Sequence, residues 1–118
     1  MSEAALTRGD ETAPDETFDA ATANRMFAAL AQPSRMAVFM QVASAGPEGS
    51  PTSTLAKTVR TTGSALTLHL RALEAAGLVE IRVRRGPRRI AVAVARIDRC
   101  ASLGRWFAER CAPAGWPG

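Results

Sequence analysis

A change in the spacing of apolar residues at Gly77 most constrains how this chain folds. Before it, Leu66, Leu70 and Leu73 repeat at the i, i+4, i+7 spacing of one helical stripe. After it, apolar and charged residues alternate, as in a strand with one buried face. Glycine often closes a helix in a left-handed conformation. The pattern therefore predicts a helix that begins near Ser64, stops at Gly77 and leads directly into a strand.

A shorter helix is predicted just before this one, over residues 51–60. We expect Ser50 or Thr52 to cap it and Pro51 to lie near its first turn. In the second helix, the face opposite the leucine stripe carries Ser64, Thr67, Leu68 and Arg71. Two such helices form a candidate DNA-reading helix-turn-helix. An ordinary helical hairpin with a solvated outer face would show the same pattern.

Residues 78–95 predict a β-hairpin with one face on the core. Apolar residues alternate with charged ones over 78–84 and with alanines over 89–95, and residues 85–88 form the turn. Five of the eight residues 82–89 are arginines: Arg82, Arg84, Arg85, Arg88 and Arg89. A charge run of this kind is usually only solvated. At a hairpin tip beside a candidate reading helix, contact with DNA phosphates is the favoured interpretation.

The rest of the chain predicts three more helices. The first begins at Phe18 with a stripe that is buried or faces a partner, formed by Phe18, Ala21, Met26, Phe27 and Leu30. The second runs from Pro33 to about Ala45, with apolar surface from Met36, Phe39, Met40 and Val42. Residues 46–51 read as a loop, and the last helix covers residues 96–111. The expected fold is therefore mainly α with a small β-hairpin (α+β).

Charge is distributed unevenly along the 118 residues. Residues 1–19 contain six acids and one arginine, a net charge of −5, so the remaining residues carry +9 of the total of +4. A basic body favours an anionic partner, with nucleic acid first. We expect residues 1–17 to be an acidic, disordered tail, residues 18–112 to be the folded domain and residues 113–118 to be a C-terminal tail.

Few residues offer chemistry other than binding. The chain has one histidine, no tyrosine, no glycine-rich phosphate loop and no nucleophile–base set, which argues against an enzyme. His69 lies on the flank of the leucine stripe, where a packed, hydrogen-bonded side chain is expected rather than a metal ligand. No apolar run approaches the roughly 18 residues of a membrane span. Two cysteines without a secretory signal indicate a reducing, cytoplasmic setting.

Two segments resemble the ArsR-type winged helix-turn-helix repressors. FAALAQPSR (residues 27–35) and SALTLHLRALEAAGLV (residues 64–79) are similar to motifs of that family, and a basic hairpin follows them in the expected order. The resemblance covers residues 22–112. It implies a winged helix-turn-helix and a homodimer formed through the first and last helices. It also implies release of double-stranded operator DNA when an inducer, often a metal or metalloid, binds.

The residues of the expected DNA face agree with this resemblance. Hydroxyl groups of Thr62, Ser64 and Thr67 can donate to phosphates or base edges, and Arg71 can reach a guanine edge or a phosphate. Ala65 and Leu68 offer apolar contact, for example to a thymine methyl group. The complete predicted set is Thr62, Ser64, Ala65, Thr67, Leu68, Arg71, Arg84, Arg85, Arg88 and Arg89.

Cys100 and Cys111 are the candidate inducer ligands. The family's cysteine motif at the start of the helix-turn-helix is absent, because residues 50–54 contain no cysteine. Eleven residues of helix separate the two Cα atoms by roughly 16 Å, beyond the reach of one disulfide or one shared ion. Two antiparallel copies of the helix, in contrast, bring Cys100 of one chain to Cys111 of the other. Gly104 and Phe107 lie on the same face.

Thiolate pairs favour soft species, so the expected inducer is trivalent arsenic or antimony, an organoarsenical or another soft metal. No cofactor is expected to be needed for folding. The same thiols could instead form inter-chain disulfides that sense oxidants, or could simply pack at the dimer seam. The predicted function is thus a repressor that an inducer releases from DNA. The alternatives are a redox-sensing repressor and a winged-helix module that binds proteins rather than DNA.

Overall fold

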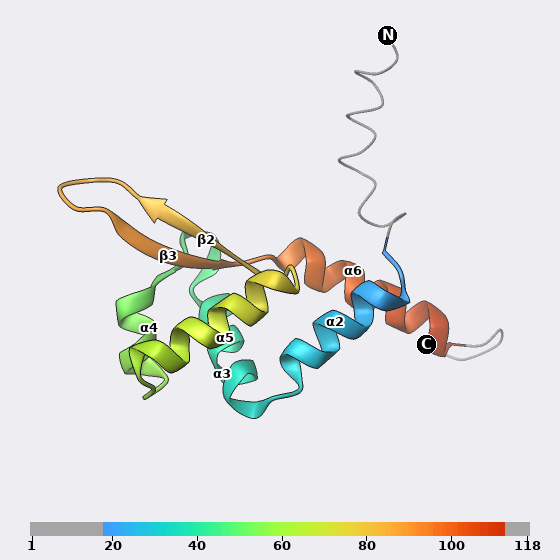
Figure 1. The fold of residues 1–118 in the computed structure, drawn as a ribbon. Helices are drawn as coiled ribbons and strands as arrows, with labels where there is room; N and C mark the ends of the chain where they lie inside the picture. The colour runs from blue at the N-terminus through green and yellow to red at the C-terminus, as the bar shows by residue number, and fades with distance from the viewer. Residues whose placement is uncertain (1–17, 113–118) are drawn as a thin grey trace, which may run out of the picture.

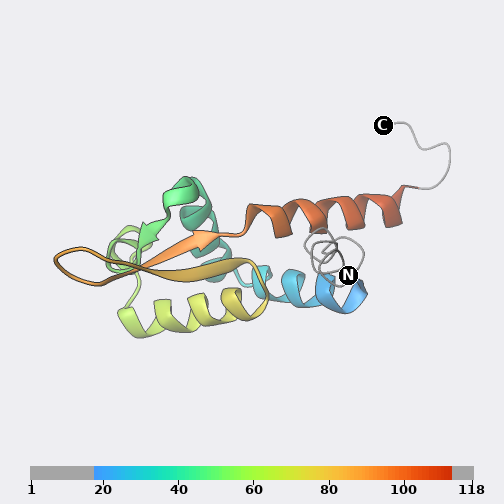
Figure 2. The same cartoon turned by 90° about the horizontal axis from the view of Figure 1, so that it is seen from above.

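The computed structural model describes residues 18–112, so the expectations for residues 1–17 and 113–118 lie outside the described residues. Elements follow in the order α2 (Ala20–Leu30), α3 (Pro33–Ser44), η1 (Gly46–Glu48), β1 (Ser50–Pro51), α4 (Thr52–Thr58), α5 (Gly63–Ala75), β2 (Val79–Arg84), β3 (Ile90–Ala95) and α6 (Ile97–Cys111). Helices α2 and α6 lie at one end, whereas α4, α5 and the β2–β3 hairpin extend to the other (Figures 1 and 2). No helix within residues 18–112 is long and apolar enough to cross a membrane.

Helix α5 forms where the leucine stripe predicts it. Leu66, Leu70 and Leu73 are all buried in the core. Thr62 caps the helix, because its Oγ1 accepts a hydrogen bond from the Ala65 N–H at 3.1 Å. Gly77 takes a φ of +80°, the left-handed conformation that ends the helix, and β2 begins two residues later. The predicted change from helix to strand at Gly77 is therefore confirmed.

The sheet has three strands rather than the predicted two. Both β1 and β2 pair antiparallel with β3, in the order β1-β3-β2. Residues 46–51 were expected to be a loop, but they form η1 and β1. Gly49 makes this possible, because a Cβ there would meet the Ala93 carbonyl oxygen at 2.6 Å. As the central strand, β3 is buried on both faces at Val92, Ala93 and Val94, so the expected one-sided burial of this strand is wrong.

Several local expectations fail at the edges of the core. Pro51 is the N-cap residue of α4, and no side chain caps this helix, so the expected cap by Ser50 or Thr52 is wrong. In α3, Val38, Phe39 and Val42 are buried, but Met36 and Met40 are exposed. Val83 and Ile90 are also exposed, because the hairpin extends beyond the core that buries its base (Figure 1).

The core joins the helical layer to the sheet. The largest fully buried side chains are Met26, Leu55, Leu73, Leu78, Val38 and Val42, which come from α2, α4, α5, α3 and the segment before β2. Leu78 anchors the start of the hairpin: its N–H donates to the Leu73 carbonyl at 2.9 Å, and its own carbonyl accepts from the Arg96 N–H at 2.8 Å. The core therefore fixes α5 and the base of the hairpin relative to each other.

Candidate nucleic-acid interface

The outer face of α5 is available to a ligand along its whole length. Ser64, Thr67, Leu68 and Arg71 are exposed, Leu68 to 65%, while Ala65 is half-buried. The Arg71 guanidinium makes no hydrogen bond or ion pair with any residue from 18 to 112. An unpaired cation beside an exposed apolar side chain, on a helix that the core holds firmly, suits contact with phosphates and base edges.

The hydroxyl groups of α5 and its cap differ in whether their protons are free for a hydrogen bond to DNA. Thr67 Oγ1 donates to the Gly63 carbonyl at 2.9 Å, so its proton is used within the helix. Thr62 Oγ1 already accepts from the Ala65 N–H and lies 3.4 Å from Ser64 Oγ. In this structure Thr67 is therefore not a free donor, and its contact with DNA stays a prediction. Ser64 remains the best-placed donor, and the first role of Thr62 is to start the helix.

Arginines of the β2–β3 hairpin, which we call the wing, divide into paired and unpaired side chains. Arg82 forms an ion pair with Glu80 at 2.9 Å, and its hydrogen bond lowers the pKa of that carboxyl group. An Arg84 nitrogen donates to the Glu48 carbonyl at 3.4 Å. Within the described residues, Arg85, Arg88 and Arg89 have no such partner, and all three are exposed. The expected cluster of five arginines is thus reduced, because Arg82 is neutralised at the base of the wing.

The wing and α5 place these groups at the same end of the molecule. In Figure 1 the wing tip and the N-terminal half of α5 both extend to the left, away from α2 and α6, and the view in Figure 2 agrees. The sequence analysis missed two further cations at this end, Lys57 and Arg60, which are exposed beside the turn between α4 and α5. Arg60 has a φ of +55°, and this left-handed residue marks the turn. A basic turn before a reading helix is the signal that could have identified them.

His69 is half-buried on the inner flank of α5, as expected for a packed side chain. Its Nδ1 is buried and has no hydrogen-bond partner in the described part of the chain, so the expected hydrogen bond is missing at this nitrogen. No group of three or more histidine, cysteine, aspartate or glutamate side chains within residues 18–112 is arranged to hold a metal ion.

Cys100 and Cys111 lie on one continuous helix, α6. Cys100 is half-buried and packs against the core, whereas Cys111 is exposed at the last residue of the helix. Burial, with a smaller contribution from Asp98, raises the pKa of the Cys100 thiol. Eleven residues at about 1.5 Å each separate the two Cα atoms by roughly 16 Å. An ion that binds the sulfur of Cys100 and the sulfur of Cys111 must therefore take them from two different chains.

The α2–α6 end exposes apolar side chains. Phe107 of α6 and Phe27 of α2 are 49% and 40% exposed, and their rings meet edge to face with centroids 5.4 Å apart. Ile97 is also exposed, and a Cβ at Gly104 would meet no described atom within 4 Å other than those of its own helix backbone and chain neighbours. The spacing of these α6 residues and the two cysteines places them on one side of the helix. We call the surface formed by Phe27, Ile97, Cys100, Gly104, Phe107 and Cys111 the apolar face.

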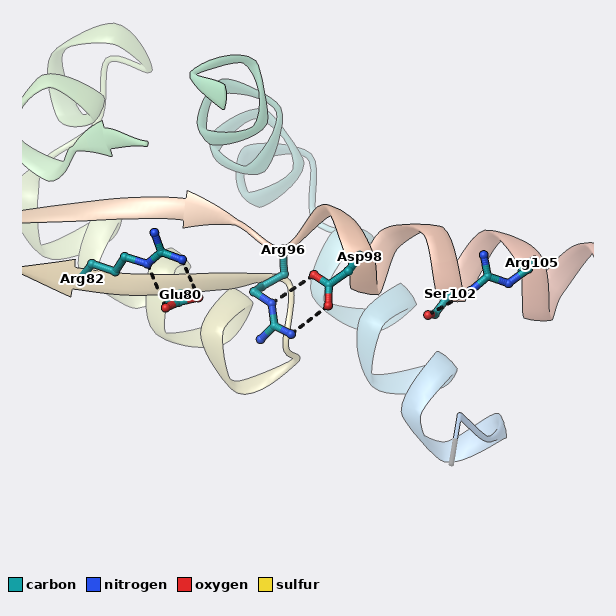
Figure 3. A network of polar contacts seen from close by, with 6 residues as sticks. All are labelled: Glu80, Arg82, Arg96, Asp98, Ser102 and Arg105. Carbon is teal, nitrogen blue, oxygen red and sulfur yellow. Dashed lines mark hydrogen bonds and ion pairs between the residues drawn. The ribbon is translucent and has the colours of Figure 1, made fainter. Parts of the chain in front are cut away.

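Short polar contacts run from the base of the wing to α6. Figure 3 shows the Arg82–Glu80 pair, the Arg96–Asp98 pair and the Arg105–Ser102 hydrogen bond in succession. Arg96 donates to both Asp98 oxygens, at 3.2 and 3.0 Å, and so lowers the pKa of this carboxyl group. The ion pair lies at the junction of β3 and α6. This pair therefore lies between the wing, with its arginines, and α6, with its two cysteines.

Comparisons with known proteins agree with this architecture. A family model described as a helix-turn-helix domain matches residues 30–82. An ArsR-like transcriptional regulator from Rhodococcus sp. RHA1 is 29% identical, with a TM-score of 0.63, and the match covers 76% of this chain and 78% of that one. NolR from Sinorhizobium fredii is 26% identical, with a TM-score of 0.57, over 83% of this chain and 92% of that one.

A third similarity concerns the fold alone. The homodimeric winged helix-turn-helix DNA-binding domain of Mb0332 from Mycobacterium bovis is 21% identical, with a TM-score of 0.53, over 82% of this chain and 87% of that one. A search of curated protein sequences found no match. The Rhodococcus protein is a transcriptional regulator and not an enzyme. A helix-turn-helix followed by a basic wing, together with these similarities, shows that the chain has a winged helix-turn-helix fold and resembles ArsR-type transcriptional regulators.

Proposed function

We propose that this regulator is a homodimeric repressor that binds operator DNA with α5 and the wing and releases it when an inducer binds Cys100 and Cys111. The observation that carries the DNA-binding half is that α5, which carries Arg71, and the wing, which carries Arg85, Arg88 and Arg89, extend to the same end of the described chain (Figure 1). A helix in the major groove and a basic hairpin on the adjacent backbone fit such an arrangement.

The apolar face supports the dimer. Aromatic rings exposed to 40% and 49% are costly in water, and covering them with a second copy removes that cost. A glycine on the same face allows two α6 helices to approach closely. The homodimeric domain from Mycobacterium bovis has the same fold. A two-fold dimer presents two copies of α5, which suits a pseudo-palindromic operator.

The thiols support an inducer site at the dimer seam. Antiparallel α6 helices bring Cys100 of one protomer near Cys111 of its partner, and two thiolates satisfy a soft species such as a methylated trivalent arsenical. The raised pKa of the Cys100 thiol lowers its thiolate fraction, which slows its reaction with oxidants. A metalloid with high sulfur affinity displaces that proton on binding. This difference favours the metalloid over the oxidant as inducer.

Arg71→Ala tests the DNA-binding half of the proposal. We expect the variant to weaken specific operator binding by about 1–3 kcal/mol, because Arg71 contacts a base edge or phosphate. Fluorescence anisotropy with the protein's own upstream DNA and a scrambled duplex measures this loss. Arg25→Ala, which removes an exposed arginine from α2 at the opposite end, is the matched control. Equal operator affinity of the two variants would contradict the assigned face.

Cys100→Ser and Cys111→Ser test the sensing half. Each variant should bind the operator as tightly as the wild type but should no longer release it when a trivalent arsenical is added, because the site needs both sulfurs. The same anisotropy titration, repeated with a mild oxidant, measures release. Release by oxidant alone would make the protein a redox switch, and an unchanged response to the arsenical in both variants would overturn the thiol site. Operator binding that ignores both reagents would leave the cysteines a packing role.

A further inference from the structure

A groove runs between α5, the N-terminal part of α4 and the inner side of the wing. Its volume is about 470 Å³, and its apolar lining includes Leu66 and Leu70 of α5, Ile81 of β2 and Ala91 of β3. Thr67 and Arg71 of α5 stand at its polar rim. The size falls within the range of roughly 300–1,000 Å³ that small-molecule sites occupy. The apolar lining suits an organic molecule better than the sugar-phosphate backbone of DNA.

Charge at the rim restricts what the groove can bind. Arg71 is the only cation among the lining residues, and it has no partner within residues 18–112. Glu74, one turn further along α5, also lines the groove and repels a second negative charge. A ligand with one carboxylate and an apolar body therefore matches the groove, because its carboxylate can pair with Arg71 while its body covers Leu70 and Ile81.

We propose that this groove binds a small aromatic or short-chain monocarboxylic acid, which competes with DNA for Arg71. The coupling to DNA rests on the proposed function; the binding of the acid does not. Thr67 and Arg71 belong both to the rim and to the outer face of α5. Occupation of the groove thus removes the Arg71 contact directly, without any change at the cysteines. The regulator then has a second inducer input at its DNA-binding end.

The test uses 1-naphthoic acid as the probe and 1-naphthalenemethanol as its uncharged match. Amide chemical shifts of the ¹⁵N-labelled full chain, followed by NMR during titration, give both the affinity and the location. We expect shifts at Thr67, Arg71, Ile81 and Ala91. In Arg71→Gln the acid should bind about fivefold more weakly, while the alcohol should bind as before, because the lost contact is an exposed ion pair.

Ala91→Leu places a larger side chain in the groove and should weaken both probes at least tenfold. Ala101→Leu, an exposed position on α6, is the matched control and should leave both affinities unchanged. If Ala91→Leu does not fold, the wild-type shift map and the Arg71→Gln comparison still decide. Shifts confined to Phe27, Phe107 and their neighbours, or equal affinities of acid and alcohol for the wild type, would overturn the proposal.

Operator binding supplies the final arm. The acid should weaken DNA binding by the wild type and not by Ala91→Leu, whereas the alcohol should have a smaller effect on the wild type. Groove binding of the acid without any operator binding by the protein would refute the proposed function and leave the acid site standing. Operator binding that is insensitive to a saturating acid would refute the competition proposed here and leave the repressor standing.

Discussion

The wing end and the α2–α6 end of this chain expose opposite kinds of surface. At the wing end, Arg71, Arg85, Arg88 and Arg89 are exposed and unpaired within the described residues. At the other end, the arginines cover aromatic rings instead: Arg110 lies 5.0 Å from the centroid of the Trp106 ring, and Phe107 remains half-exposed beside it. Within residues 18–112, the wing end thus exposes arginines without counter-charges, and the α2–α6 end exposes aromatic rings without apolar cover.

This difference predicts different partners and different responses to salt. Unpaired cations attract a polyanion, and that attraction weakens as the salt concentration rises, because the release of condensed counterions then gains less entropy. Burial of aromatic rings depends little on salt at moderate concentrations, because it removes apolar surface from water. DNA binding and self-association should therefore be separable by ionic strength and by single substitutions at either end.

Phe107→Glu should have the largest effect at the apolar end. A charge placed in the seam between two α6 helices is buried without a partner, so we expect self-association to weaken at least a hundredfold, about 3 kcal/mol. Sedimentation velocity over a concentration series measures the shift. Leu68→Glu is the matched control, because Leu68 is 65% exposed but lies on α5. It should leave self-association intact while weakening DNA binding. If both variants dissociate into monomers, or if neither does, the assignment of the apolar face as the dimer interface would be wrong.

Arg88→Ala should have an intermediate effect, confined to the wing end. Loss of one phosphate contact lowers the slope of log K against log salt by about one, so the loss of affinity between 50 and 200 mM salt should shrink by about three- to fourfold. Anisotropy titrations at several salt concentrations give the slope. Arg82→Ala is the control, since Glu80 already pairs with Arg82. A larger change in slope for Arg82→Ala than for Arg88→Ala would contradict the assignment of Arg88, rather than Arg82, as the arginine that contacts phosphate.

Asp98→Asn should have the smallest effect, at the junction of the two ends. Arg96 holds the pKa of Asp98 below its ordinary value of 3.8, so the ion pair stabilises the fold above that pH and is lost as the pH falls through the folded-state pKa. Because the Asp98 side chain is 62% exposed, the free energy involved is below about 1 kcal/mol.

Thermal melts followed by circular dichroism measure this difference. The variant should melt at a lower temperature than the wild type at pH 7, and the gap should narrow as the pH falls below 3.8. Glu109→Gln is the control, because Glu109 meets Arg110 only at 3.5 Å on an exposed turn, and its effect should be smaller still. A gap that stays constant with pH would show that the carboxylate charge of Asp98 does not contribute.

Local spacing predicted the elements of this fold, and it failed where distant segments meet. The leucine stripe of α5, its stop at Gly77 and the alternation in β2 each depend on neighbours within a few residues, so the sequence expresses them directly. The burial of both faces of β3 depends on a segment far away in the chain, because Gly49 after η1 lies against the side chains of Val92 and Val94. Met36 and Met40 are exposed for the same reason, because only packing decides which apolar side chains of α3 reach the core.

By itself, the sequence determined that a helix-turn-helix is followed by a basic hairpin and by a helix with two cysteines three turns apart, because helical and strand periods position those residues. Tertiary structure alone decided which of the candidate groups are free. Glu80 neutralises Arg82, and Thr67 donates its hydroxyl proton to the Gly63 carbonyl. Arg71, in contrast, lines an apolar groove and has no partner among residues 18–112. Whether a side chain can bind a ligand depends on which groups folding brings within a few ångströms of it. The spacing of residues in the sequence does not give this information.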